Sequence, residues 1–237
     1  DGQTLLLGWD SLQINLGLYK SVPYEIKSFA PVSLAIYTPQ IFVANRSVPA
    51  KNVRDFIALA KSRRGITMAS AGSGSPGHLA GALFSALTGT QLIHVQYKGG
   101  APAVIDLLGG HVDVLFVSLP TALQHVRTGR LTAYGVSTKT RAPSLPEVPT
   151  LIEQGLKDAD VDMWYGLFAP KDTPPAIVAR LVKEINLVLR LPAIRERFAA
   201  EVGDYLVVGI FADGHDGTMM AESLRVEGVA SICWVNH

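Results

Sequence analysis

The feature that most constrains the fold is a regular alternation of short apolar runs with amphipathic stretches between Ile41 and Gly155. The runs have the length and composition of buried strands, and the stretches between them place apolar residues at helical spacing. Such alternation is typical of α/β proteins with a mainly parallel sheet. The predicted strands are 41–44, 66–69, 93–97, 112–117 and 131–137, and the predicted helices are 53–60, 76–87, 102–108 and 120–128.

Residues that begin and end helices support these boundaries. Asn52 and Ser75 stand where a helix needs an N-cap, and Pro76 follows Ser75 at the first helical position. Gly89 and Gly129 stand just beyond helices, where glycine is the usual terminator.

A second group of elements follows the proline-spotted connection 141–149. It consists of a short helix ending at Gly155, a strand at 163–168 and a long helix opened by Pro174 and Pro175. The apolar face of this long helix is predicted to hold Ile177, Leu181, Ile185, Val188 and Leu189. We expect two lobes, residues 41–159 forming one and residues 1–40 with 160–237 forming the other. Clefts between lobes are where small ligands usually bind.

Composition narrows the classes of function. The formal net charge is +1, and no basic patch with interleaved aromatics is present, so nucleic-acid binding is not expected. The single cysteine, Cys233, excludes an internal disulfide and a cysteine-rich zinc site. The long uncharged stretch 65–97 is broken by glycines, and its apolar runs are too short to cross a bilayer. A soluble protein is therefore expected.

A glycine-rich loop follows the strand 66–69. Gly72 to Gly77 matches the G-x-G-x-x-G pattern of dinucleotide-binding proteins. That fingerprint also needs an acidic residue about 20 positions further on, and none occurs between Asp55 and Asp106. A nicotinamide cofactor is therefore not expected.

The loop can still bind an anion. Glycines let the backbone approach a ligand, and the N–H groups at a helix start attract negative charge. Ser70, Ser73 and Ser75 add hydroxyl groups, and His78 is expected chiefly to bond the loop. The alternative is a helix start that is simply capped. A second loop, 97–103, also joins a strand to a helix, and the two helix starts, at Ser75 and Ala101, should converge at one sheet edge.

No catalytic constellation is recognisable. The sequence contains no G-x-S-x-G elbow and no H-E-x-x-H zinc motif. His94 and His125 are expected to be surface or packed residues. Asp113 is predicted either to face the ligand or to cap a strand, and Trp164 and Tyr165 are expected in the core.

Several ordered motifs together resemble one family, the TctC or Bug solute-binding proteins. Asn15 and Tyr19 resemble its early Asn-x-x-x-Tyr element, and the resemblance extends to about residue 200. The longer matching segments are 70–81, 97–103, 106–113, 145–150 and 164–170.

The resemblance implies a periplasmic-binding-protein-like (type II) fold, a periplasmic location and delivery of a ligand to membrane transporter subunits. It implies a small carboxylate ligand (an organic acid or amino acid), no enzyme activity, no cofactor, no metal and a monomer. The ligand-binding residues it implies are Ser73, Gly74, Ser75, His78, Tyr97, Gly99, Gly100, Ala101 and Asn15.

The sequence departs from the family pattern at three places. The family's opening strand and Pro-Gly-Gly loop are missing, Val117 stands where members often have Asp, and residues 201–237 do not resemble the family's last helices. We therefore expect this chain to bind its ligand weakly or not at all, and a non-functional fragment stays an alternative. An α/β enzyme acting on a phosphorylated or nucleotide substrate is the less favoured one.

Overall fold

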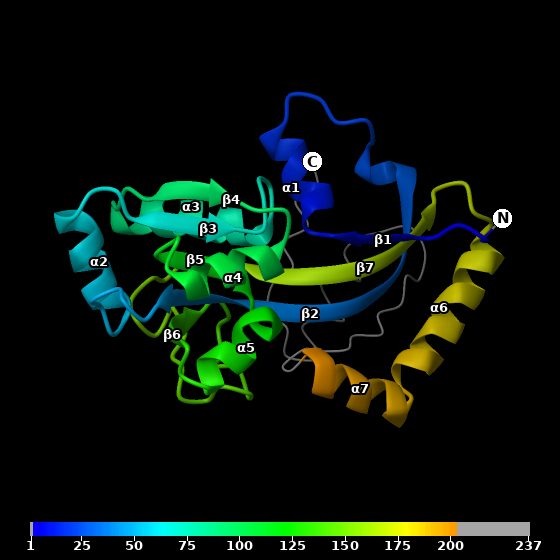
Figure 1. Ribbon diagram of the computed structural model, residues 1–237. Coiled ribbons are helices and arrows are strands. Elements are labelled where there is room, and N and C mark those ends of the chain that lie inside the picture. The colour runs from blue at the N-terminus through cyan, green and yellow to red at the C-terminus, as the bar shows by residue number, and fades with distance from the viewer. Residues whose placement is uncertain (1, 203–237) are drawn as a thin grey trace. The chain divides into compact units, whose positions relative to one another are not determined.

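The computed structural model describes residues 2–202, which fall into two compact units (Figure 1). Unit 1 combines the residues up to Tyr37 with Trp164–Ala200, and unit 2 contains Thr38–Met163. The long strand β2 (Phe29–Asn45) starts in unit 1 and continues into unit 2. The sequence predicted only residues 41–44 of this 17-residue strand.

Unit 2 is built on a mixed sheet. Its strands are β2, β3 (Thr67–Ser70), β4 (Ile93–Gln96), β5 (Val114–Ser118) and β6 (Leu131–Val136). They lie in the order β6-β2-β5-β3-β4. β3 pairs in parallel with both β4 and β5, whereas β2 is antiparallel to β5 and β6. Strands β3, β4, β5 and β6 therefore share one direction, as the predicted parallel sheet requires. β2 runs in the opposite direction between β5 and β6.

Helices cover both faces of this sheet. They are α2 (Val53–Ser62), α3 (Pro76–Thr88), α4 (Gly100–Gly109) and α5 (Leu119–Arg127). Alternate residues of β2 point to opposite faces, as the pleat requires. Ile41 packs with Leu107 of α4 and Leu119 of α5, while Phe42 packs with Phe56 of α2 and Phe84 of α3. The α/β fold class predicted from the alternating pattern is confirmed.

The predicted caps form. The Asn52 side chain accepts a hydrogen bond from the Asp55 amide at 2.9 Å, and the Ser75 hydroxyl accepts one from the His78 amide at 3.2 Å. Gly89 ends α3 in the left-handed conformation, with φ of 66°. The helix predicted to end at Gly155 is wrong, because residues 151–155 form successive turns.

Unit 1 contains β1 (Leu6–Trp9), which pairs antiparallel with β7 (Asp162–Pro170), so that Trp9 lies opposite Tyr165. Its helices are α1 (Ser11–Leu18), the short 3₁₀ helix η1 (Ile26–Ser28), α6 (Pro175–Leu189) and α7 (Pro192–Val202). Val32, Ala169 and Val182 form its small core.

The apolar face of α6 is only partly the predicted one. Leu181 and Ile185 pack on the core as expected, and Leu189 is buried. Val182 and Asn186 are also buried, whereas Val188 is 49% exposed. The buried face is therefore rotated toward Val182 relative to the prediction. Residues 203–237, which include most of the divergent C-terminal segment, lie outside the described residues.

Candidate functional site

The loops that follow β3 and β4 lie against each other at one edge of the unit 2 sheet. β3 and β4 are parallel and end together, with Ser70 opposite Gln96. The Tyr97 amide donates to the Ser70 carbonyl at 3.1 Å, and the Gly99 amide donates to the Ala71 carbonyl at 3.2 Å. The predicted convergence of the two helix starts at one sheet edge is confirmed.

Inside the first loop, most polar groups already bond one another. The Ser75 hydroxyl donates to the Gly72 carbonyl at 2.7 Å while capping α3. The Gly74 amide donates to Nδ1 of His78 at 3.2 Å, which is the loop-bonding role expected for this histidine. Ser73 is different, because it is exposed. A ligand could therefore reach the Ser73 hydroxyl without breaking the loop's own hydrogen bonds.

The second loop leaves backbone donors at the start of α4. Gly99 precedes the helix with φ of 117°, and no side chain caps it. The third helical residue, Pro102, has no N–H, so Gly100 and Ala101 carry the uncapped N–H groups of the first turn. A helix start with two such donors favours an anion.

Tyr97 ties the end of β4 to α4, and its role in ligand binding stays a prediction. Its hydroxyl donates to the Asp106 carboxylate at 2.7 Å, which ties the strand end to α4. Burial, with this bond and the Asp106 charge, raises the pKa of Tyr97 to about 12. The phenol therefore stays neutral and hydrogen-bonded to Asp106. The backbone carbonyl of Tyr97 is the part that lies next to the first loop, since a Cβ added to Gly72 would be 3.2 Å from this oxygen.

A third helix start, which the sequence reasoning missed, adjoins these loops. β5 is parallel to β3, so α5 begins at the same edge. A Cβ placed on Gly100 would lie 2.9 Å from Val117 Cγ2 and 3.5 Å from Thr121 Cγ2. The Thr121 hydroxyl lies 2.8 Å from the Ser118 hydroxyl. The parallel direction of β5 was the signal that could have placed Ser118 and Thr121 at this sheet edge.

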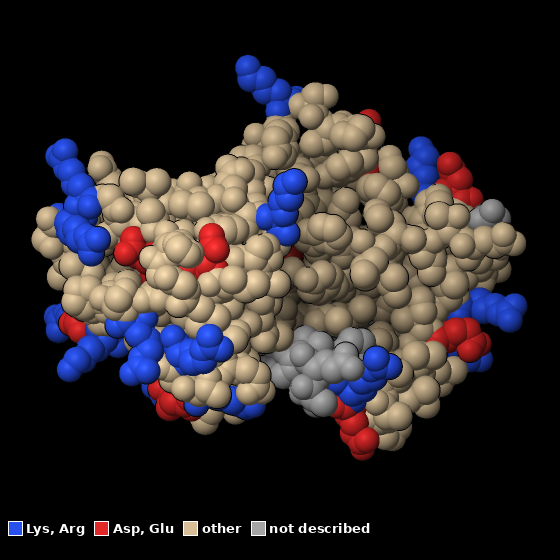
Figure 2. Space-filling view, in the orientation of Figure 1, with Lys and Arg blue, Asp and Glu red and all other residues tan. Residues whose placement is uncertain are grey.

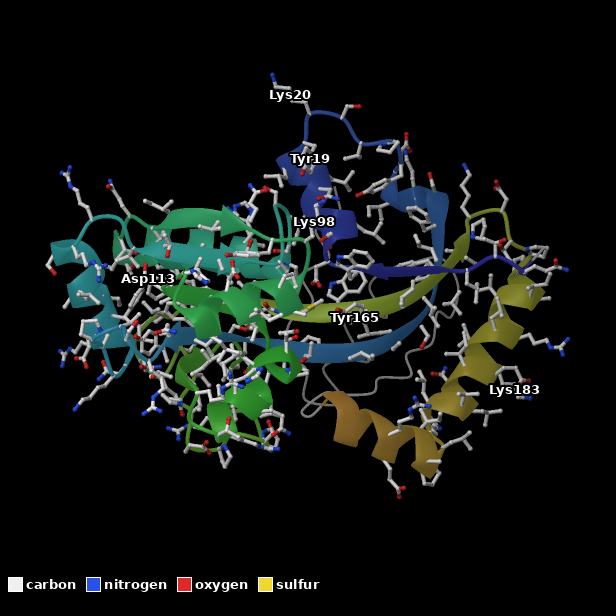
Figure 3. The ribbon with its side chains drawn as sticks, in the orientation of Figure 1. Tyr19, Lys20, Lys98, Asp113, Tyr165 and Lys183 are labelled. Carbon is white, nitrogen blue, oxygen red and sulfur yellow. The ribbon has the colours of Figure 1, made fainter. Side chains whose placement is uncertain are left out.

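Asp113 lies at the other end of the strands. Its Oδ2 accepts hydrogen bonds from the Thr67 amide at 2.7 Å and the Thr67 hydroxyl at 2.8 Å. Figure 3 shows Asp113 well apart from Lys98, which follows the other end of β4. Of its two predicted roles, Asp113 therefore has that of a strand cap.

The remaining predicted residue, Asn15, belongs to α1 in unit 1, where its carbonyl accepts the Tyr19 amide at 3.0 Å. Its role in binding stays a prediction. The same unit holds a carboxyl that the sequence reasoning overlooked. Asp10 is buried, and its Oδ2 accepts a hydrogen bond from the Trp164 amide at 3.0 Å. Burial raises the pKa of Asp10 to about 7.

Charge is sparse around the loops. From Gly65 to Tyr97 the chain has no Lys, Arg, Asp or Glu, and Figure 2 shows a correspondingly broad uncharged surface over α3, β3 and β4. Within residues 2–202, no group of three His, Cys, Asp or Glu side chains is placed to hold a metal ion. In the same range, no helix is long and apolar enough to span a membrane.

Comparisons with known proteins identify the family. The model of the tripartite tricarboxylate transporter family receptor, TctC, matches residues 1–207. The protein of the tcbD–tcbE intergenic region of a Pseudomonas species is 38% identical over 199 residues, which is 83% of this chain and 59% of that protein. BugT of Bordetella pertussis is 37% identical over 205 residues, or 85% and 63% of the two chains. The chain thus spans about three-fifths of these curated relatives.

Solved structures agree in fold. The periplasmic binding protein BugD has a TM-score of 0.82 at 31% identity, covering 97% of this chain and 75% of that one. MatC of Rhodopseudomonas palustris, solved with malate, has a TM-score of 0.82 at 29% identity, covering 97% and 78%. Another R. palustris protein, solved with adipate, has a TM-score of 0.83 at 28% identity, covering 97% and 77%. This chain belongs to the TctC/Bug family of substrate-binding proteins and has their type II periplasmic-binding-protein fold.

Proposed function

We propose that this chain is an extracytoplasmic solute-binding protein that captures a small carboxylate for a tripartite tricarboxylate transporter. The observation that carries the proposal is the pairing of the first loop with the uncapped start of α4 at one sheet edge. The malate and adipate bound in two structural neighbours give the ligand class.

In this proposal a ligand carboxylate takes the Gly100 and Ala101 amides, and the exposed Ser73 hydroxyl is the candidate third donor. Gly74, Ser75, His78, Tyr97 and Gly99 hold these donors in place through bonds within the protein. Hydrogen bonds to a charged group contribute about 1.5–3 kcal/mol each. Two or three such hydrogen bonds, with no cation beside them, give an affinity that suits a ligand that must be released again.

We propose the transporter partner and the periplasmic location as well, and the family and a solved periplasmic transporter protein of similar fold support them. The family and the solved neighbours are substrate-binding proteins. The Ser70 hydroxyl lies 2.6 Å from His94 Nε2, but it is fully buried and bonded to the Gly72 backbone, so we propose binding without chemistry. A monomer is expected because each copy carries both loops.

The test is a thermal-shift screen of this chain with malate, succinate, adipate, glutamate and benzoate, at up to about 10 mM so that weak binding also registers. A ligand that binds the native state at a hundred times its Kd adds about 2.7 kcal/mol, which raises the melting temperature by several degrees.

Adipamide is the matched control for adipate, because it keeps the carbon chain and carbonyls but carries no charge. We expect adipate or another diacid to stabilise the protein and its diamide to have no effect. Equal shifts with acid and diamide, or no shift with any carboxylate, would contradict the proposal.

A further inference from the structure

Two histidines, one on α3 and one on β4, stack beside the first loop. The rings of His78 and His94 are 4.2 Å apart between centroids and only 13° from parallel. Each ring also bonds the loop. His78 Nδ1 accepts from the Gly74 amide at 3.2 Å, and His94 Nε2 lies 2.6 Å from the Ser70 hydroxyl. The stack therefore holds the loop at both of its ends.

The hydrogen bonds fix the protonation state of His78. A backbone amide can only donate, so Nδ1 of His78 must be unprotonated to accept from Gly74. Protonated Nδ1 would instead present a second donor to the Gly74 amide, and that bond would be lost.

The bonds around Ser70 are consistent with a neutral His94. Ser70 is fully buried, and its hydroxyl also bonds the Gly72 carbonyl at 3.2 Å and accepts the Gly72 amide at 3.3 Å. If His94 Nε2 donates, the hydroxyl accepts two hydrogen bonds, from Nε2 and from the Gly72 amide, and donates one to the Gly72 carbonyl. Its hydrogen-bonding capacity is then fully used. Burial and, secondly, the neighbouring His78 lower the pKa of His94.

Within β3, α3 and β4, no other charged side chain accompanies this pair. β4 is at the sheet edge and packs against β3, and the titratable groups on β3, α3 and β4 are His78 and His94 themselves. In the loop after β4, the Tyr97 hydroxyl donates to the Asp106 carboxylate, and Lys98 is the charged side chain of residues 97–103. Two stacked imidazolium rings would repel each other in this partly buried place.

We propose that His78 and His94 are positioning residues, whose neutral stack keeps the first loop in its anion-binding shape and makes that shape depend on pH. Protonation of the stack breaks the bond from the Gly74 amide to His78 Nδ1 and separates the rings. The loop then loses the preorganisation that its capped helix start provides. The part of this inference that concerns ligand affinity rests on the proposed function, whereas the loop's response to protons does not.

The direct test follows the Gly74 amide and the two imidazole rings by NMR between pH 8 and 5, in the protein without ligand. We expect the Gly74 amide resonance to move in step with protonation of the His78 ring. Its hydrogen exchange, corrected for intrinsic rate, should become faster over the same range. A Gly74 resonance that stays fixed while both rings titrate would overturn the proposal.

Two conservative variants separate positioning from mere packing. Asn Oδ1 in His78→Asn can accept from Gly74 at every pH, so this variant should retain the loop and lose the pH response. Gln Nε2 in His94→Gln can still donate to Ser70 but cannot stack or titrate. His111→Gln, an exposed histidine of the same unit, is the control and should keep the wild-type response. A response that persists unchanged in His78→Asn would also overturn the proposal.

Calorimetry with whichever carboxylate binds at pH 7.5 gives the second readout. We expect affinity to fall roughly fivefold or more by pH 5.5, which corresponds to the loss of about one neutral hydrogen bond, and to change little in His78→Asn. Binding that is independent of pH, or tighter in acid, would contradict the inference and leave the proposed function standing. Absence of binding at every pH would contradict the proposed function, and the Gly74 measurement would still decide this inference.

Discussion

Asp10 and Trp164 are 154 positions apart in the chain, yet the Asp10 carboxylate accepts the Trp164 amide at 3.0 Å. The bond joins the turn after β1 to β7, within unit 1. Asp10 also bonds its own backbone amide, but a buried carboxylate held by backbone amides without a cation is poorly compensated for the water it has lost. Asp10 therefore destabilises unit 1 when it is ionised.

The first prediction is that Asp10→Asn stabilises the protein at neutral pH. The folded pKa of about 7 exceeds the ordinary value of 3.8, so between these values the folded state binds more protons than the unfolded state. Stability must then fall as pH rises from about 4 to 7. The asparagine variant, which can still accept the Trp164 amide, should gain on the order of 1–3 kcal/mol at pH 8 and almost nothing at pH 4.

Urea unfolding of both proteins across this pH range is the measurement. Because Asp172 is exposed, Asp172→Asn makes a suitable control and should show no such crossover. A gain that is the same at pH 4 and pH 8 would show that ionisation of Asp10 is not the cause.

A second prediction concerns the aromatic cluster of unit 2. Phe42 is fully buried, stacks on Phe116 with centroids 4.2 Å apart, and meets Phe56 and Tyr134 edge-on. Phe42→Ala should destabilise the protein by about 3–5 kcal/mol, through lost burial and the cavity left behind. The urea midpoint reports it. Leu87→Ala, at a site 39% exposed, should cost less than about 1 kcal/mol.

Glycine at the start of α3 gives a third prediction. A Cβ on Gly77 would collide with the Phe116 carbonyl, a backbone atom that cannot move without distorting β5. Gly77→Ala should therefore destabilise by about 1–3 kcal/mol, although alanine is the better helix former. Gly17→Ala, in α1 with open space around it, should be neutral or slightly stabilising. Thermal unfolding of the two variants measures whether each substitution lowers or raises the stability of the protein.

The helices and loops of unit 2 could be predicted because their signals are local. Asn52, Ser75 and Gly89 act on hydrogen bonds within a few residues, and the structure places them at the predicted helix ends. The meeting of the two loops followed from the parallel direction of β3 and β4, which the alternating pattern implies.

Other features could not be predicted because they depend on pairing between distant segments. The antiparallel insertion of β2 between β5 and β6 joins residues 70–95 positions apart, and no local pattern encodes it. The stacking of His78 on His94 needs α3 to lie over the edge strand, so each histidine alone suggested nothing more than a surface or loop residue. The Asp113 side chain was ambiguous for the same reason, until its partner Thr67 was known.

The last prediction tests the ligand donors themselves. Ala101→Pro removes one of the two uncapped amides at the start of α4, and proline is well tolerated within the first helical turn. If the proposed function is right, loss of one hydrogen bond to a carboxylate should weaken binding by roughly tenfold to a hundredfold. Ala101→Ser keeps the amide and is the matched control. Calorimetry with the best ligand of the screen measures the difference, and unchanged melting of the ligand-free variants shows that the fold is intact. If Ala101→Pro binds as tightly as Ala101→Ser, the carboxylate does not use this amide, and the donors must be sought at the start of α5, where Ser118 and Thr121 lie at the same sheet edge.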